Sequence, residues 1–241
     1  MDRSRLELEP GIWLDARRAV WLKDERVLIV ADLHLGYAWA HRHNGNLLPV
    51  SAREDTPNRL QELAMTYAPS ELVLLGDIVH RALAIEPLQE QLCELFDALS
   101  EITKLRLITG NHDAQLAPLL RGCGIDAELA PAYRAGPHLL LHGDSVPSGP
   151  TDAEIHVHPL PGGRMFIGHE HPAISISDGG ARCAKCPCFV IGADFVVLPA
   201  FSRWAAGTDV RGRELMSPLI RASRPERAIA IVADKLLPLR L

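Results

Sequence analysis

The chain lacks the features that mark membrane-spanning, secreted and strongly basic proteins. No apolar run approaches the roughly 20 residues that a membrane-spanning helix needs. The segment from Met1 to Glu9 is charged and lacks the apolar core of a signal peptide. The net charge is -5 with His neutral, so no basic field covers the molecule as a whole. We therefore expect a cytoplasmic protein that does not contact a membrane and does not bind nucleic acid by charge alone.

The cysteines do not form the even set that a disulfide framework requires. There are 5, and three of them are close together at Cys183, Cys186 and Cys188. This usage favours a reducing compartment. Two interpretations of the cluster remain. It could bind a structural zinc with a fourth ligand such as Cys123, or it could consist of reduced, partly buried thiols. The second interpretation is favoured, because no fourth zinc ligand is evident near the cluster.

Neither an internal repeat nor a low-complexity linker divides the chain. Its 241 residues, 47% of them hydrophobic, are enough to bury a large core. We therefore expect a single domain that spans residues 1–241.

The dominant pattern is a short apolar run followed at once by a polar cluster. The runs are residues 26–31, 72–75, 105–109, 138–141 and 165–167. Continuous runs of Leu and β-branched residues are typical of strands covered on both faces.

Two helices are predicted between the first three of these strands. One begins at Asp55 or Thr56 with Pro57 in its first turn, and the other spans residues 87–99. Strand–helix–strand order predicts parallel pairing. Beyond about residue 172, runs at 189–191, 195–198 and 228–232 predict a second sheet packed on the first.

The polar clusters themselves consist of metal-binding residue types. They are Asp32-x-His34, Gly76-Asp77-x-x-His80, Gly110-Asn111-His112-Asp113, His142-Gly143 and Gly168-His169-x-His171. Functional groups of open α/β sheets gather beyond the carboxyl ends of strands, and Asp, His and Asn suit Mn, Fe or Zn. The alternative is that these residues only cap helices or form turns at the strand ends. That alternative would require the same arrangement to arise five times by coincidence.

These five clusters resemble the motifs of the calcineurin-like metallophosphoesterases, over roughly residues 27–172. The resemblance implies an α/β fold in which two mixed sheets form a β-sandwich flanked by helices, in a four-layer αββα order. It also implies a site for two divalent metal ions, most simply Mn²⁺, with Fe or Zn as alternatives.

The resemblance assigns a role to each cluster. Asp32, His34 and His171 would bind the first metal. The second would be bound by Asn111, His142 and His169, and Asp77 would bridge both. His112 would act as the general acid beside the scissile phosphate, oriented by Asp113. For His80 the choice between orienting a ligand, approaching the substrate and stabilising a turn stays open.

The chemistry of this set suits phosphate-ester hydrolysis. Two carboxylates offset about half of the charge of two divalent ions, and the remaining positive charge attracts a phosphate ester and favours hydroxide over water. A carboxylate such as Asp77 has enough lone pairs to contact two ions. An imidazole can protonate the leaving alkoxide.

Further segments resemble the ligase-associated DNA damage response endonucleases (PdeM type), relatives of the SbcD-type nucleases. They are residues 32–36 and 47–50, residues 168–172, residues 187–189 and residues 197–201. This resemblance implies a Mn-dependent phosphodiesterase that acts on DNA in repair, beside an ATP-dependent DNA ligase, a helicase and an exonuclease. Glu170, in place of an apolar residue, and a Cys-bearing insertion at residues 179–186 depart from the pattern.

Two surfaces could contact DNA or could simply be solvated. One is the loop after the first cluster, with Trp39, His41, Arg42 and His43. The other is the basic C-terminal part, which includes Arg203, Arg211, Arg213, Arg221, Arg224, Arg227, Lys235 and Arg240. His156 and His158 match no family ligand and are expected to be non-catalytic.

Two alternative functions remain at this stage. One is a phosphomonoesterase or small-nucleotide phosphodiesterase at the same site, because fold does not decide substrate. The other is a catalytically silent scaffold of the same fold, which the complete set of ligand candidates disfavours.

Overall fold

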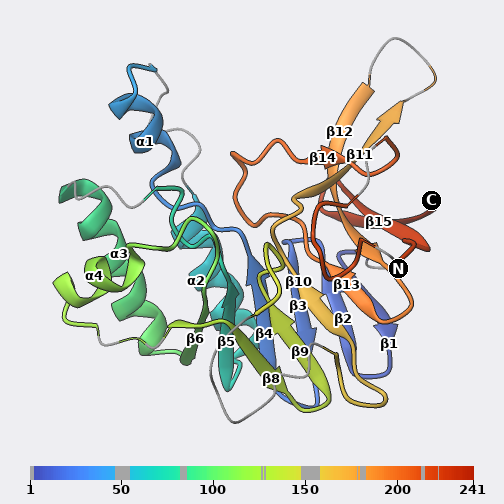
Figure 1. Ribbon diagram of the computed structural model, residues 1–241, viewed down its shortest axis with the longest axis horizontal. Coiled ribbons are helices and arrows are strands. Elements are labelled where there is room, and N and C mark those ends of the chain that lie inside the picture. Colours follow the sequence, from blue (N-terminus) through green and yellow to red (C-terminus); the bar gives the residue numbers. More distant parts are fainter. Residues whose placement is uncertain are drawn as a thin grey trace.

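The computed structural model describes residues 3–46, 55–81, 86–125, 127, 129–147, 158–177, 179, 183–212, 215–221 and 223–241. Residues 47–50, 156 and 213, each singled out from the sequence, lie outside this part. The strands form two packed sheets, and the helices lie together on one side of them (Figure 1).

The first sheet runs in the order β1-β2-β3-β4-β5-β6-β7. Its strands are β1 (Arg5–Glu9), β2 (Ile12–Asp15), β3 (Ala19–Leu22), β4 (Val27–Ala31), β5 (Glu71–Leu75), β6 (Lys104–Ile108) and β7 (Leu129–Ala130). β4, β5 and β6 are parallel, as the strand–helix–strand order predicts. The antiparallel hairpins β1–β3 precede them and were not predicted.

The helices cover one face of this sheet. They are α2 (Thr56–Tyr67), α3 (Glu86–Ser100) and α4 (Leu116–Gly122). Successive side chains of a strand point to opposite faces, so Leu28 and Val30 of β4 pack in the helical core, whereas Ile29 faces the second sheet. α2 begins beside Asp55 with Pro57 in its first turn, as predicted.

One short helix was not expected. α1 (Tyr37–His43) occupies the segment that the sequence analysis treated as a loop. Its N-terminal neighbour Gly36 has φ 74°, and a Cβ there would lie 2.7 Å from the Leu88 side chain. α1 thus begins where the backbone passes close to α3.

The second sheet contains β14-β11-β12-β13-β10-β9-β8 in that order, with β15 paired to β12 and β16 paired to β15. The strands are β8 (Ala132–Ala135), β9 (His138–Leu141), β10 (Met165–Ile167), β11 (Pro172–Ser177), β12 (Cys183–Ile191), β13 (Phe195–Val197), β14 (Thr208–Asp209), β15 (Arg227–Val232) and β16 (Lys235–Arg240). Phe166, Phe189 and Ile229 pack against Ile29 and Val73 of the first sheet. The prediction of a second sheet packed on the first is therefore confirmed.

The outer face of the second sheet is not covered by helices in the described part of the chain, whereas the expected four-layer order implied that it would be. Leu215, Leu219 and Ile220 pack on Val190 and Val197 there. Within the described ranges, this irregular segment takes the place of a second helical layer. The α/β class with two mixed sheets and flanking helices is confirmed.

The structure contains a disulfide, which the cysteine usage did not predict. Cys93 of α3 and Cys123, just after α4, form a disulfide, so Cys123 cannot serve as a zinc ligand. Cys183 is exposed and Cys188 buried on β12. None of the metal-ligating groups found among the described residues contains a cysteine. Of the helices described, none has the length and apolarity needed to cross a membrane.

Candidate metal centre

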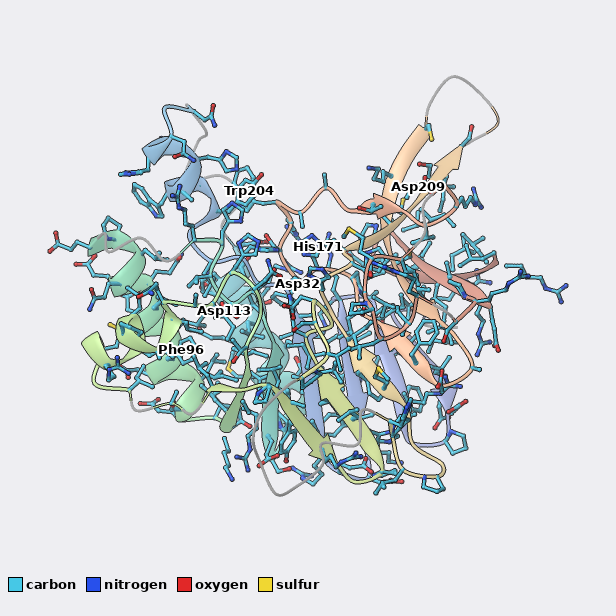
Figure 2. All side chains as sticks on the ribbon, viewed as in Figure 1. Asp32, Phe96, Asp113, His171, Trp204 and Asp209 are labelled. Atoms are coloured by element: carbon cyan, nitrogen blue, oxygen red, sulfur yellow. A yellow bond between two sulfur atoms is a disulfide. The ribbon has the colours of Figure 1, made fainter. Side chains whose placement is uncertain are left out.

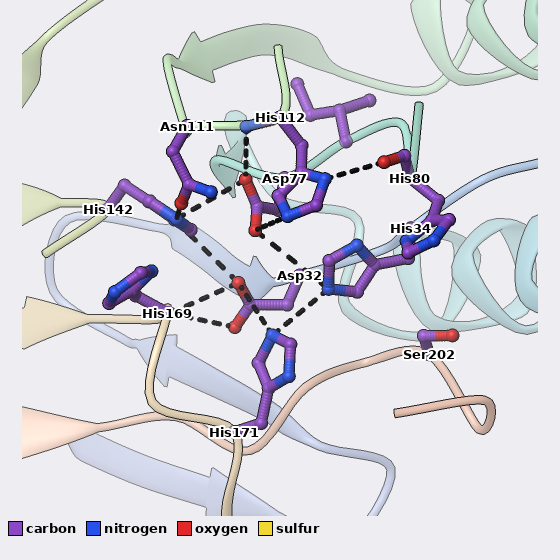
Figure 3. Close-up of polar contacts among 12 residues, drawn as sticks. Asp32, His34, Asp77, His80, Asn111, His112, His142, His169, His171 and Ser202 are labelled. Carbon is purple, nitrogen blue, oxygen red and sulfur yellow. Dashed lines mark hydrogen bonds and ion pairs between the residues drawn. The ribbon is translucent and has the colours of Figure 1, made fainter. Parts of the chain in front are cut away.

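The loops that follow β4, β5, β6, β9 and β10 meet at one edge of the two sheets (Figure 2). Each predicted ligand lies on one of these loops: Asp32, His34, Asp77, Asn111, His142, His169 and His171. Figure 3 shows that their side chains converge on a common centre. This convergence was predicted, because parallel strands end at the same edge of a sheet.

The first half of the centre contains four side chains. Asp32, His34, Asp77 and His171 offer ligand atoms that all lie within 4.8 Å of one another. Nε2 of His34 lies 3.0 Å from Nε2 of His171, and the latter lies 3.5 Å from Oδ1 of Asp32. These distances leave one shared position for a cation.

The second half shares Asp77 with the first. Asp77, His142 and His169 form a second group with the same spacing. Nε2 of His142 lies 3.4 Å from Oδ1 of Asp77 and 3.2 Å from Oδ1 of Asn111. Oδ2 of Asp77 lies 4.0 Å from Nε2 of His34. Asp77 therefore stands between the two groups, one oxygen toward each.

The backbone at these positions adopts an uncommon conformation. Five of the predicted ligands have left-handed φ values: Asp32 (56°), His34 (47°), Asp77 (47°), His169 (64°) and His171 (44°). Such values cost energy for residues other than Gly, and they gather at functional sites. The loops therefore adopt a strained conformation that directs these side chains inward.

Two motif glycines permit the close approach of these loops. A Cβ on Gly110 would lie 2.3 Å from the backbone nitrogen of Asp77. A Cβ on Gly76, whose φ is 70°, would lie 2.4 Å from Nδ1 of His142. Any side chain at either position would displace a predicted ligand.

Burial and neighbouring side chains both shift the pKa values of the predicted ligands. Burial lowers the pKa of His34 to about 3, so this ring is neutral near pH 7. Burial also works against ionisation of Asp32, but the hydrogen bond and charge of His171 outweigh it and keep the pKa of Asp32 below its ordinary value. Neutral imidazoles and an ionised carboxylate are the forms that bind metal.

The donor set fits divalent cations. Nε2 of His34 and Nε2 of His171 lie 3.0 Å apart, so one proton at most can lie between them. Asp32 and Asp77 are buried, and buried carboxylates need opposite charge. A cation in each half would satisfy both requirements.

The surroundings of His142 fix the atom that it would offer to a metal. Nδ1 of His142 lies 2.9 Å from the carbonyl oxygen of Leu75 and donates its proton there. Nε2 is the ring nitrogen nearest Asp77 and Asn111, so it is the atom that would meet a metal.

His112 lies beside the centre, but Asp113 does not orient it. Nδ1 of His112 donates to the backbone oxygen of His80 at 2.6 Å, and Nε2 lies 3.9 Å from Oδ2 of Asp77. The buried Asp113 carboxylate instead accepts from the backbone N–H groups of Gly110, Ile78 and Val79. The carbonyl of His80 thus takes the role that the sequence analysis gave to Asp113.

The contacts of two supporting residues, Glu170 and Arg18, were not predicted from the sequence. The buried carboxylate of Glu170 accepts from the backbone N–H of Ser217 at 2.5 Å. Arg18 donates to the carbonyls of Ala200 and Ser202. A half-buried arginine in the turn of a hairpin carries no local sequence signal, and only the fold shows what it contacts.

The surfaces proposed for DNA contact differ in structure. Arg42 lies over the Trp39 ring on α1, 5.8 Å from its centroid. In the C-terminal part, Arg203 pairs with Asp55 at 2.7 Å and Arg211 donates to the carbonyl of Ser175. These two arginines already have partners within the protein.

His158 is exposed, and its carbonyl accepts from Arg134.

The fold and the site together define a metal-dependent phosphoester hydrolase. Residues 25–172 match the model of the calcineurin-like phosphoesterase family, and the chain belongs to this family. The crystal structure of Pseudomonas putida nuclease MPE is similar to this chain with a TM-score of 0.65 and 26% sequence identity, covering 99% of this chain and 100% of that one. No curated protein matches the sequence.

Proposed function

We propose that the protein is a phosphodiesterase that cleaves DNA by means of two divalent metal ions, most simply Mn²⁺. The observation that carries this proposal is the arrangement of two ligand groups that share Asp77, with His112 facing the shared carboxylate. The likeness to a nuclease over nearly the whole chain supports a nucleic-acid substrate.

The seven side chains would hold the two ions in adjacent positions. Asp32, His34 and His171 would bind one ion, and Asn111, His142 and His169 the other, with Asp77 between them. When bound, such a pair supplies positive charge for the phosphate and lowers the pKa of water, so that hydroxide is available near neutral pH.

The protein itself would handle the leaving group. Nδ1 of His112 is committed to the carbonyl of His80, so Nε2 is the atom that can deliver a proton. Nε2 faces the shared carboxylate, and 37% of the side chain is exposed to approaching substrate. A leaving alkoxide at this position would take the proton from Nε2.

The cellular setting is part of the same proposal. By the resemblance to the ligase-associated endonucleases, the protein would work in the cytoplasm in DNA repair, beside an ATP-dependent DNA ligase, a helicase and an exonuclease. Copurification of a tagged chain with such a ligase from its own cells would test this association.

A substrate panel in Mn²⁺ tests the activity. We expect wild-type protein to hydrolyse a bis-aryl phosphate and to cut single-stranded DNA, with little turnover of a mono-aryl phosphate. Asp77→Asn should lose at least about 100-fold of the diesterase activity, because the shared ligand is lost. Asp194→Asn, at an exposed turn, is the matched control.

The opposite preference would replace the proposal with a phosphomonoesterase at the same site. Turnover of none of the substrates with any divalent metal would favour a silent scaffold.

A further inference from the structure

A row of aromatic rings leads from the metal centre to α1. The rings of His112 and His80 are stacked with centroids 5.5 Å apart and an interplanar angle of 23°. His80 is stacked in turn on His41 at 5.7 Å and 13°, and its centroid lies 4.5 Å from that of Tyr37. Tyr37 is stacked on Trp204 at 5.5 Å and 11°. The row starts at the proposed general acid and ends at two large rings.

The tryptophan is held rigidly relative to the metal ligands. Backbone N–H groups of Phe201 and Ser202 donate to the carbonyls of Ala31 and Asp32. The carbonyls of residues 200, 201 and 202 accept from Arg18 and Arg59. Trp204 therefore follows a segment that is tied to the first ligand loop (Figure 2).

The helix is tied to the same loops. Leu35, just before α1, bridges to Val79, and its carbonyl accepts from the backbone N–H of His80. These bonds fix Tyr37 and His41 relative to His80. Ring faces that are preorganised in this way lose little entropy when a ligand binds.

The exposure and charge of this surface suit an anionic ligand. Tyr37, His41, His80 and Trp204 are all half-buried, so part of each residue is open to solvent. α1 carries no acidic residue, and its last turn has His41, Arg42 and His43. A surface of aromatic rings with nearby cations is the kind that binds single-stranded nucleic acid.

Packing alone does not account for Trp204. Its indole N–H is buried and has no acceptor within the described part of the chain, which is unfavourable for a buried donor. A purely structural role would be served better by an apolar ring such as Phe.

We propose that Tyr37, His41 and Trp204 form a nucleobase-binding subsite that stacks an unpaired base next to the phosphate at the metal centre. The inference rests on the proposed phosphodiesterase function and names the residues that would contact a base of a single strand. A base within a duplex has both faces covered by its neighbours and cannot stack on these rings.

Two strands of equal length would test the subsite. One is an oligothymidylate, and the other carries abasic residues at its four central positions. Wild-type protein in Mn²⁺ should cut the central phosphates of the first strand about 10-fold faster, because the abasic strand offers no base to stack. Trp204→Leu and Tyr37→Leu should bring this ratio toward one.

Two further variants control for folding. Trp204→Phe keeps a ring and should keep most of the ratio. Trp13→Leu changes a half-buried tryptophan of β2 and should leave the ratio unchanged. Thermal melting of each variant shows whether it is folded.

Equal cleavage of both strands by the wild type would overturn the subsite while leaving the phosphodiesterase assignment intact. The subsite would also be overturned if folded Trp204→Leu and Tyr37→Leu showed the same ratio of cleavage rates as the wild type. Cleavage of neither strand, together with no turnover of a bis-aryl phosphate, would overturn the proposed function and the subsite with it.

Discussion

At the scale of single residues, the centre depends on side chains that the backbone holds in unfavourable conformations. The left-handed φ values at Asp32, Asp77 and His171 could not be predicted from residue type, because Asp and His prefer other regions. The motifs predicted which side chains converge, and the structure shows how the loops achieve it.

His112 should prove essential for turnover but not for metal binding. We expect His112→Ala to lower kcat on DNA by about 10²–10⁴-fold, because the leaving group loses its proton donor. The turnover of a bis-(nitrophenyl) phosphate, whose leaving group needs no proton, should fall much less. His158→Ala, an exposed histidine, is the control. Loss of bound metal in His112→Ala, measured by elemental analysis, would contradict this role.

Asp113 should stabilise the folded protein, because its carboxylate accepts hydrogen bonds from three backbone N–H groups. Asp113→Ala is expected to lower the free energy of unfolding of metal-free protein by about 3 kcal/mol in urea denaturation. Burial raises the pKa of Asp113 to about 6. Its contribution to stability is therefore full below pH 3.8 and declines as the pH rises to about 6.

The difference between wild type and Asp113→Ala should consequently be larger at pH 4 than at pH 7. Unchanged stability together with lost activity would instead support the sequence-based view that Asp113 orients His112.

At the scale of elements, the periodicity of apolar residues was sufficient to predict the long helices and the buried strands. α2, α3 and the parallel strands β4–β6 lie where the apolar pattern placed them. α1 was missed because seven residues with no side-chain cap carry too weak a signal, and such a short helix depends on tertiary contacts. The Cys93–Cys123 pair was missed because sequence spacing does not show that α3 and α4 lie side by side.

The element that covers the second sheet is joined to the metal loop through Glu170. Glu170→Ala should lower metal affinity by about 10-fold, because His169 and His171 flank this residue and the bond to Ser217 holds their loop. Glu170→Gln keeps an acceptor oxygen and should retain most of the affinity. Titration with Mn²⁺ measures both. Equal affinity of wild type and folded Glu170→Ala would show that the loop does not need this bond.

At the scale of the whole molecule, two sheets bring together side chains separated by more than a hundred residues. His34 and His171 lie on loops that follow strands of different sheets, and their Nε2 atoms are 3.0 Å apart at the centre. The resemblance of the motifs to those of the calcineurin-like phosphoesterases predicted this meeting. The aromatic row could not be predicted, because Trp204 reaches Tyr37 only through the packing of the segment at residues 200–204 against the first sheet.

The most direct test of the central claim is the number of metal ions that the chain binds. We predict that wild-type protein dialysed against Mn²⁺ retains about two ions per chain, and that Asp77→Asn retains fewer, because Asp77 belongs to both ligand groups. Wild-type protein that binds no ion, or an Asp77→Asn variant that binds as many as the wild type, would contradict the account.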